Sequence, residues 1–228
     1  MKNIISTTSL LSLLAVGGLS AATLQPDAEA QKALTPDGVL KDLMEGNARY
    51  VEGKLSDANV TARIKKATEG QFPKAYILSC VDSRVPVEQV FDQGIGDIFV
   101  GRVAGNIEGV EQLGSMEFAS AAAGVKLVMV LGHEACGAVK GACDHVELGN
   151  LTELLAEIKP AVDAVKTEGD RSSKNKEFVD KVIEANVRKT VADLRERSEV
   201  LAGLEKEGKI KIVGALYSLQ DGKVTLVD

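Results

Sequence analysis

Two short segments carry the side chains best suited to chemistry. The first contains Cys80, Asp82 and Arg84, and the second contains His133 and Cys136. Proteins hold zinc with thiolate and imidazole ligands, and a catalytic zinc site takes three of them and leaves the fourth position for water or substrate. The His-x-x-Cys spacing at a strand-to-helix turn directs both side chains to one point. The sequence therefore predicts a zinc site formed by Cys80, His133 and Cys136.

The aspartate and arginine of the first segment are spaced to act on that site. Alternate residues of an extended segment point to the same side, so Asp82 and Arg84 share a side with Cys80. Arg84 can pair with Asp82 through two parallel hydrogen bonds, which keeps the carboxylate ionised and oriented. We expect Asp82 to accept a hydrogen bond from zinc-bound water and to fix its direction. Released from Arg84, Asp82 would instead become a fourth zinc ligand.

Strand-like and helix-like segments alternate along most of the chain. This alternation predicts an α/β fold with a central, mainly parallel β-sheet flanked by helices and an N-terminal helical arm. Ligands of such sheets bind beyond the carboxyl ends of the strands, and Cys80 and His133 each follow a predicted strand. The expected strands are 75–78, 97–100, 125–131, 210–219 and 224–227, and the expected helices are 35–51, 109–123, 138–165 with a break near Gly149, and 178–204.

The first residues have the pattern of a secretory signal peptide. Lys2 precedes an apolar run over 4–19, and the small residues at 20–22 suit a signal peptidase. The run is shorter than the ~20 apolar residues that span a bilayer, although an uncleaved anchor is the alternative. We expect export to the periplasm, cleavage near Ala22 and no stable membrane anchor afterwards. The expected organisation is a signal peptide (1–22), a linker (23–34) and a single domain (35–228).

Composition and the remaining reactive residues narrow the range of possible functions. The chain of 228 residues carries a net charge of −6, so it has no basic excess with which to bind nucleic acid. A disulfide between Cys80 and Cys136 is the alternative to a zinc site, because an exported compartment is oxidising. Cys143 is expected to be a buried small hydrophobe. His145 and Glu134 are expected at the surface.

The two segments together resemble the β-class carbonic anhydrases. The resemblance rests on C-x-D-S-R at 80–84 and on G-H-x-x-C-G-A at 132–138. Further similarity lies at 35–51, 96–106 and 213–224, so the resemblance covers about 35–228. It implies one zinc ion per subunit, held by the three ligands named above, and a zinc-bound hydroxide that attacks carbon dioxide to give bicarbonate and a proton. Asp82 and Arg84 would orient that oxygen.

The resemblance also implies where substrate binds and how subunits associate. Gln71 matches a glutamine that binds substrate or bicarbonate and takes part in catalysis. The backbone N–H groups of Gly137 and Ala138 would add to the substrate site at a helix start. Homodimers or dimers of dimers are expected, with Gln71 serving the zinc of the partner subunit. Arg102 matches an arginine of a regulated closed state, but the chain has no tryptophan to support that state, so the open form is expected.

Two other functions remain open at this point. The same ligand set would serve a hydrolase of carbonyl sulfide or carbon disulfide. A non-catalytic protein that binds zinc or senses thiols would need the three ligands but not Asp82, Arg84 or Gln71, because a closed structural site leaves no position for substrate.

Overall fold

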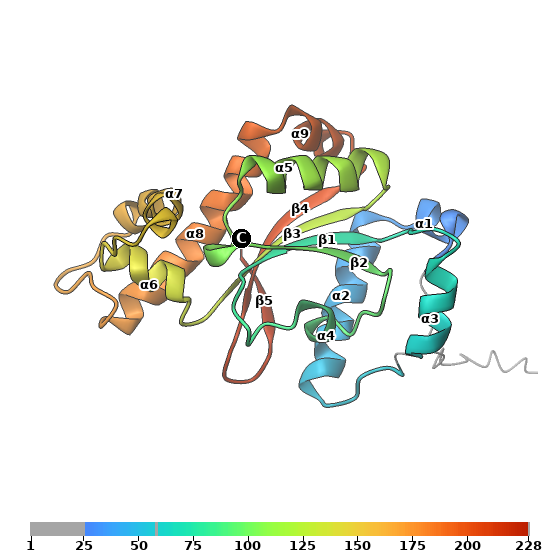
Figure 1. Ribbon diagram of the computed structural model, residues 1–228, viewed down its shortest axis with the longest axis horizontal. Helices are drawn as coiled ribbons and strands as arrows, with labels where there is room; N and C mark the ends of the chain where they lie inside the picture. The colour runs from blue at the N-terminus through green and yellow to red at the C-terminus, as the bar shows by residue number, and fades with distance from the viewer. Residues whose placement is uncertain (1–25, 58, 228) are drawn as a thin grey trace, which may run out of the picture.

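The computed structural model describes residues 26–57 and 59–227. Its centre is a five-stranded sheet in the order β2-β1-β3-β4-β5, in which the first four strands are parallel and β5 is antiparallel to β4 (Figure 1). The predicted α/β fold is confirmed. The strands are β1 (Ala75–Ser79), β2 (Ile98–Arg102), β3 (Leu127–His133), β4 (Lys211–Tyr217) and β5 (Val224–Val227).

The two central strands are buried along their whole length. Every residue of β1 and of β3 is buried, as expected for parallel strands that are covered on both faces. β3 begins and ends two residues later than the sequence predicts, because its pairing with β4 continues until His133 lies opposite Tyr217. β1 ends at Ser79, which lies opposite Leu131. Cys80 and His133 are therefore delivered to the same edge of the sheet.

Helices α2 (Pro36–Val51) and α4 (Val87–Val90) cover one face of the sheet (Figure 1). Thr35 begins α2 as predicted, with its hydroxyl accepting a hydrogen bond from the Gly38 N–H. The segment 23–34, which the sequence assigns to a linker, contains a short helix, α1 (Ala28–Ala33). Gln31 anchors α1 by donating hydrogen bonds to the carbonyls of Pro73 and Ala123. α3 (Val60–Ala67) is a short helix in the polar segment between α2 and β1.

The other face of the sheet is covered by α5, α8 and α9. The predicted helix 178–204 is two helices, because Ser198 is extended and its hydroxyl accepts a hydrogen bond from the Leu201 N–H, which begins a new helix. The expected helix 109–123 ends in a π-helical turn. The elements are α5 (Val110–Glu117), the turn Phe118–Ala122, α8 (Lys176–Arg197) and α9 (Glu199–Lys206).

A third apolar cluster lies beyond the carboxyl ends of β1 and β3. It combines α6 (Gly137–Cys143), α7 (Asn150–Ala164) and the first half of α8 with Cys80 and Cys136. Gly149, with φ +46°, separates α6 from α7 as predicted. Among residues 26–57 and 59–227, no helix has the length and apolar character needed to cross a bilayer. The expected signal peptide lies outside the described residues.

Candidate metal centre

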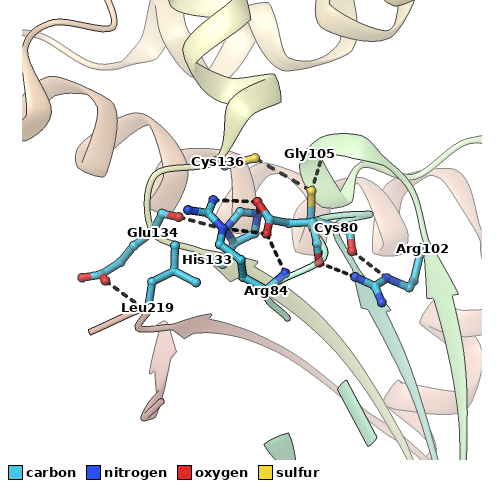
Figure 2. Close-up of polar contacts among 9 residues, drawn as sticks. Cys80, Arg84, Arg102, Gly105, His133, Glu134, Cys136 and Leu219 are labelled. Carbon is cyan, nitrogen blue, oxygen red and sulfur yellow. Dashed lines mark hydrogen bonds and ion pairs between the residues drawn. The ribbon is translucent and has the colours of Figure 1, made fainter. Parts of the chain in front are cut away.

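Three side chains converge at the carboxyl edge of the sheet (Figure 2). Cys80 directly follows β1, His133 is the last residue of β3, and Cys136 is the N-cap of α6. One ligand atom from each lies within 4.8 Å of the other two, and all three residues are buried. The structure thus brings together the three residues that the sequence predicts as zinc ligands.

The donor atoms fit a tetrahedral zinc ion. The two sulfur atoms are 4.0 Å apart, so they are free thiols, and they lie close to the roughly 3.8 Å that two 2.3 Å zinc–sulfur bonds would set. His133 is fully buried, and its Nδ1 lies 2.8 Å from the Glu134 carbonyl oxygen, to which it can only donate. Nε2 then carries the lone pair, and no hydrogen-bond partner for it exists among the described residues. This orphaned acceptor is what a metal ion would satisfy.

The two thiols differ strongly in acidity when no metal is bound. The Cys136 thiol donates to the Cys80 sulfur, which lowers the pKa of Cys80 to about 4 despite its burial. The same hydrogen bond, together with burial, holds the pKa of Cys136 far above its ordinary value. One proton is therefore shared between the two sulfur atoms. A zinc ion takes its thiol ligands as thiolates, so its binding would release this proton.

Asp82 and Arg84 form the bidentate pair that their spacing predicts. Arg84 Nε lies 2.9 Å from Asp82 Oδ1, and Nη2 lies 2.7 Å from Oδ2. These hydrogen bonds hold the pKa of Asp82 well below its usual range. Asp82 Oδ2 is also 3.8 Å from His133 Nε2, the atom that points to the expected metal position. An ionised carboxylate in a fixed orientation thus borders the three candidate ligands.

Arg102 braces the segment that carries these groups. It ends the neighbouring strand β2, and its Nε and Nη2 donate to the carbonyls of Cys80 and Asp82 at 2.8 and 2.5 Å (Figure 2). The Gly105 N–H donates to the Cys80 sulfur at 3.4 Å. The sequence singles out Arg102 only for its match to a regulatory arginine. In the structure, its hydrogen bonds hold the backbone of the segment that carries Cys80 and Asp82.

The sequence led us to expect Glu134 at the surface, facing solvent, but the structure shows its carboxylate bound to another loop. Its carboxylate accepts hydrogen bonds from the Leu219 N–H at 2.9 Å and from the Gln220 side-chain amide at 3.0 Å. Glu134 therefore ties the loop after β3 to the loop after β4. The reason is the β3–β4 pairing, which ends at the neighbouring residue and brings the two loops together. The backbone carbonyl of Glu134 separately orients the His133 ring through its hydrogen bond with Nδ1.

The comparisons with known proteins agree with this geometry. A family model described as carbonic anhydrase matches residues 75–224. The chain is 36% identical over 199 residues to "Carbonic anhydrase 2" of Mycobacterium tuberculosis, covering 85% of this chain and 93% of that protein. The chain belongs to the carbonic anhydrase family. A carbonic anhydrase of Mycolicibacterium smegmatis is 38% identical over 197 residues, which are 84% of this chain and 93% of that protein.

Solved structures show that the fold is that of the β-carbonic anhydrases. The Coccomyxa β-carbonic anhydrase superposes with a TM-score of 0.66 at 24% identity, over 82% of this chain and 86% of that one. A tetrameric β-carbonic anhydrase of Sordaria macrospora superposes with a TM-score of 0.64 at 22% identity, over 83% and 96% of the two chains. The resemblance seen in the sequence is confirmed. This carbonic anhydrase is an enzyme that uses zinc, and Cys80, His133 and Cys136 provide a matching Cys-His-Cys cluster.

Gln71 lies away from the zinc ligands of its own chain. It is exposed in the loop before β1, whereas Cys80 follows the other end of that strand. The five residues of β1 alone span about 17 Å at the usual rise per residue. A single chain of this carbonic anhydrase therefore does not bring Gln71 to Cys80.

The other residues that the sequence singles out lie near the cluster. Gly137 and Ala138 are the first residues of α6, directly after Cys136, and Gly137 is exposed. Cys143 is buried, as predicted, and burial raises the pKa of its thiol to about 11. His145 is exposed, as predicted. Neither Cys143 nor His145 belongs to the metal-ligand cluster found among the described residues.

Proposed function

We propose that this carbonic anhydrase catalyses the reversible hydration of carbon dioxide to bicarbonate and a proton, with Cys80, His133 and Cys136 as the ligands of one zinc ion per subunit. The observation that carries the proposal is the convergence of two free thiols with a buried, unpartnered imidazole nitrogen. A zinc ion bound there would supply the nucleophile, because it lowers the pKa of a water molecule toward neutrality.

Asp82 is proposed to orient the attacking water. Its carboxylate is acceptor-only when ionised, so a water molecule beside it must direct a hydrogen toward it and a lone pair elsewhere. The hydrogen bonds from Arg84 keep the pKa of Asp82 so low that it does not retain the released proton at neutral pH. Asp82 therefore positions the water and does not serve as the final base. Arg84, whose side chain is 53% exposed, holds this orientation from the solvent side.

Asp82 could become a fourth zinc ligand only if its pairing with Arg84, seen in this structure, were broken. Both carboxylate oxygens of Asp82 are engaged by Arg84. Binding of the carboxylate to the metal would require these bonds to break, at a cost of roughly 1.5–3 kcal/mol for each charged hydrogen bond. The paired arrangement supports the open form, in which the fourth position is available to water.

Substrate binding is proposed to involve Gln71 from a partner subunit together with the start of α6. The position of Gln71 at the far end of β1 supports a contribution to a second copy. At the start of α6, the N–H groups of Val139 and Ala138 are directed at the Cys136 sulfur, although the hydrogen bond with Cys80 and burial outweigh them and keep the pKa of Cys136 raised. Gly137 is exposed and has open space beside its Cα, so its N–H is the more accessible donor for an anion.

A homodimer or a dimer of dimers is proposed as the working form. β2 is an edge strand, and large apolar side chains next to it are exposed, including Val110 at 72% and Phe118 at 54%. Patches of this kind are typical of protein–protein interfaces. One solved relative, from Sordaria macrospora, is described as tetrameric. Light scattering of the purified enzyme gives its subunit number, and a monomer would contradict this proposal.

A stopped-flow assay of carbon dioxide hydration with a pH indicator tests the activity. We expect turnover that scales with zinc content and is lost on chelation. Faster release of hydrogen sulfide from carbonyl sulfide on the same preparation would favour the hydrolase alternative. Bound zinc with turnover of neither substrate would favour a non-catalytic zinc protein. Each of these last two results would overturn the proposed reaction.

Export to the periplasm is proposed from the N-terminal sequence pattern alone. The expected product begins near residue 23, after removal of 1–22. Mass spectrometry of the protein recovered from the periplasmic fraction of an expressing bacterium tests this. An intact N-terminus in the cytoplasmic fraction would contradict it.

A further inference from the structure

Gly105 connects the Cys80 sulfur to a distant helix. Its N–H donates to Cys80 Sγ at 3.4 Å, as Figure 2 shows. Its carbonyl accepts a hydrogen bond from the side-chain amide of Asn186 at 2.8 Å. Gly105 and Asn186 are both buried, so neither hydrogen bond competes with bulk water. A chain of two buried hydrogen bonds thus runs from α8 to the thiol of Cys80.

The backbone of Gly105 needs an external restraint to keep this geometry. Its φ is +75°, in the left-handed region, and a glycine can leave this conformation for many other φ and ψ values because it has no Cβ. The N–H and the carbonyl belong to the two peptide planes on either side of its Cα. A hydrogen bond that holds the carbonyl plane therefore limits the rotation that would turn the N–H away from Cys80. Asn186 supplies that hydrogen bond.

Helix α8 is well placed to act as the support. Val187, the residue after Asn186, packs against Gly132 and Gly214, where an added Cβ would lie only 2.5 and 2.7 Å from its methyl groups. These glycines belong to β3 and β4, and Gly132 directly precedes His133. The close approach fixes α8 against the strand that carries a zinc ligand. Asn186 therefore projects from a helix whose position relative to His133 and the metal-ligand cluster is fixed by packing.

A polar side chain at this position has no other evident task. Asn186 is 1% exposed on the apolar side of α8, and its Oδ1 has no hydrogen-bond partner among the described residues. Burying an amide with only part of its hydrogen bonds satisfied costs free energy. Its Nδ2 bond to Gly105 is the side-chain contact that offsets this cost.

We propose that Asn186 is a positioning residue of the metal centre, which acts through Gly105 to keep a backbone N–H on the Cys80 sulfur. The inference rests on the proposed role of Cys80 as a zinc ligand. Hydrogen bonds to a ligand atom orient it and tune its donation to the metal, and their loss costs about 10- to 100-fold in metal affinity or activity. Asn186 never touches substrate in this scheme.

The test replaces Asn186 with Leu, which keeps the number and branching of the heavy atoms, with somewhat larger terminal groups, but removes the amide donor. Zinc affinity is measured by competition with a chelator, and the cobalt-substituted protein is examined for its thiolate-to-cobalt absorption band. We expect Asn186→Leu to weaken zinc binding about tenfold and to shift the band. Asn186→Ala serves the same purpose if the leucine variant does not fold. A purely structural role would lower the melting temperature without moving the band.

Thr190→Val is the matched control. Thr190 lies one turn further along α8, is fully buried and has a hydroxyl with no hydrogen-bond partner among the described residues. This variant should keep the wild-type zinc affinity and cobalt band. Wild-type values in the Asn186 variants, or equal changes in Thr190→Val, would overturn the inference. Absence of a thiolate band in the wild-type protein would instead overturn the proposed ligand set on which the inference depends.

Discussion

Gln71 and Cys80 lie at opposite ends of β1, so one chain holds a candidate substrate ligand and a candidate metal ligand that cannot meet. In a dimer with a twofold axis, Gln71 of each subunit could lie beside Cys80 of the other. A twofold interface repeats every such contact, because residue i of one copy meets residue j of the other and the reverse. Each site would then combine Asp82 of one subunit with Gln71 of the other. The active enzyme would need both copies, although each copy carries a complete set of zinc ligands.

Mixed dimers test this division between subunits. Gln71→Ala and Asp82→Asn should each impair the homodimer strongly. A mixed dimer of the two variants has one site with both residues intact, so random mixing after dissociation should restore about a quarter of the wild-type sites in an isologous dimer. Stopped-flow activity measured before and after mixing shows the recovery.

Mixing each variant with wild-type protein leaves the number of intact sites unchanged in either scheme, so it controls for activity that is lost during dissociation and reassociation. Mass spectrometry of subunits that differ in mass shows the exchange itself. If both residues served the zinc of their own chain, the mixed dimer would contain two impaired sites. Activity that stays at the level of the separate variants, despite proven exchange, would contradict the shared site.

Asp82→Asn separates orientation from metal binding. The amide keeps the size of the carboxylate but loses its charge and can donate a hydrogen bond to the water, so the preference for one water orientation is lost. We expect kcat to fall about 10- to 100-fold, the loss typical when a group that orients a metal-bound ligand by hydrogen bonding is removed. Zinc content should remain at one per subunit. Stopped-flow kinetics and metal analysis on the same sample make the measurement, and unchanged kcat would refute the orienting role.

The sequence predicted the strands that carry the ligands, because two continuous apolar runs end at Cys80 and near His133. It also predicted the Asp82–Arg84 pair, whose geometry depends only on local spacing. It could not predict that Glu134 binds the loop after β4, since that contact depends on strands that are distant in the sequence. A polar Asn186 on the apolar side of a helix was the signal that could have revealed its role.

Zinc removal should expose a reactive pair of thiols. Cys80 and Cys136 have sulfur atoms 4.0 Å apart, and the lowered pKa of Cys80 provides a thiolate at neutral pH. We expect the zinc-free enzyme to form a Cys80–Cys136 disulfide with a mild oxidant such as diamide, which takes up the two thiol hydrogens. Zinc-loaded enzyme should resist the same treatment, because both sulfur atoms would be bound to metal.

Peptide mapping by mass spectrometry without reduction identifies the bond. Cys143 is the internal control, since its buried thiol has a pKa raised to about 11 and should stay reduced. A disulfide that includes Cys143, or equal oxidation with and without zinc, would show that the arrangement of the two thiols is different in solution.

Asp92 should make the fold sensitive to acid. Burial pushes the pKa of Asp92 upward, but hydrogen bonds from Arg49 and Ser56 outweigh it and leave the pKa below its ordinary value. A carboxyl with a lowered pKa in the folded state stabilises the fold above its unfolded pKa of about 3.9, and this contribution is lost as the pH falls through the folded value. Asp92→Asn should therefore destabilise the protein by about 1–3 kcal/mol at pH 7.

Urea unfolding of both proteins at pH 7 and near pH 3 measures this difference. The two free energies of unfolding should approach each other at the lower pH. Asparagine also tolerates the left-handed backbone of this position, where φ is +51°, so the substitution tests the charge and not the backbone. A difference that does not change with pH would argue against the ionised pair.

Gly132→Ala should disturb the sheet at the residue before His133. The added Cβ would lie 2.5 Å from a methyl of Val187 and 3.0 Å from one of Leu216, so α8 must move away from β3. We expect a loss of about 1–3 kcal/mol, which is typical of overpacking. Val187→Ala in the same chain should recover part of this loss, as measured by chemical unfolding. Simple addition of the two separate effects would mean that the clash is relieved elsewhere.

The direct pairing of β1 with β3 has a consequence for how the protein matures. β2 and α5 lie between these strands in the chain, so a long loop must close before Cys80 and His133 come together. A partly folded chain, in which only neighbouring segments have formed, offers no complete metal site. Metal capture should therefore lag behind helix formation during refolding, and a cobalt absorption signal would report the moment at which the sheet is complete.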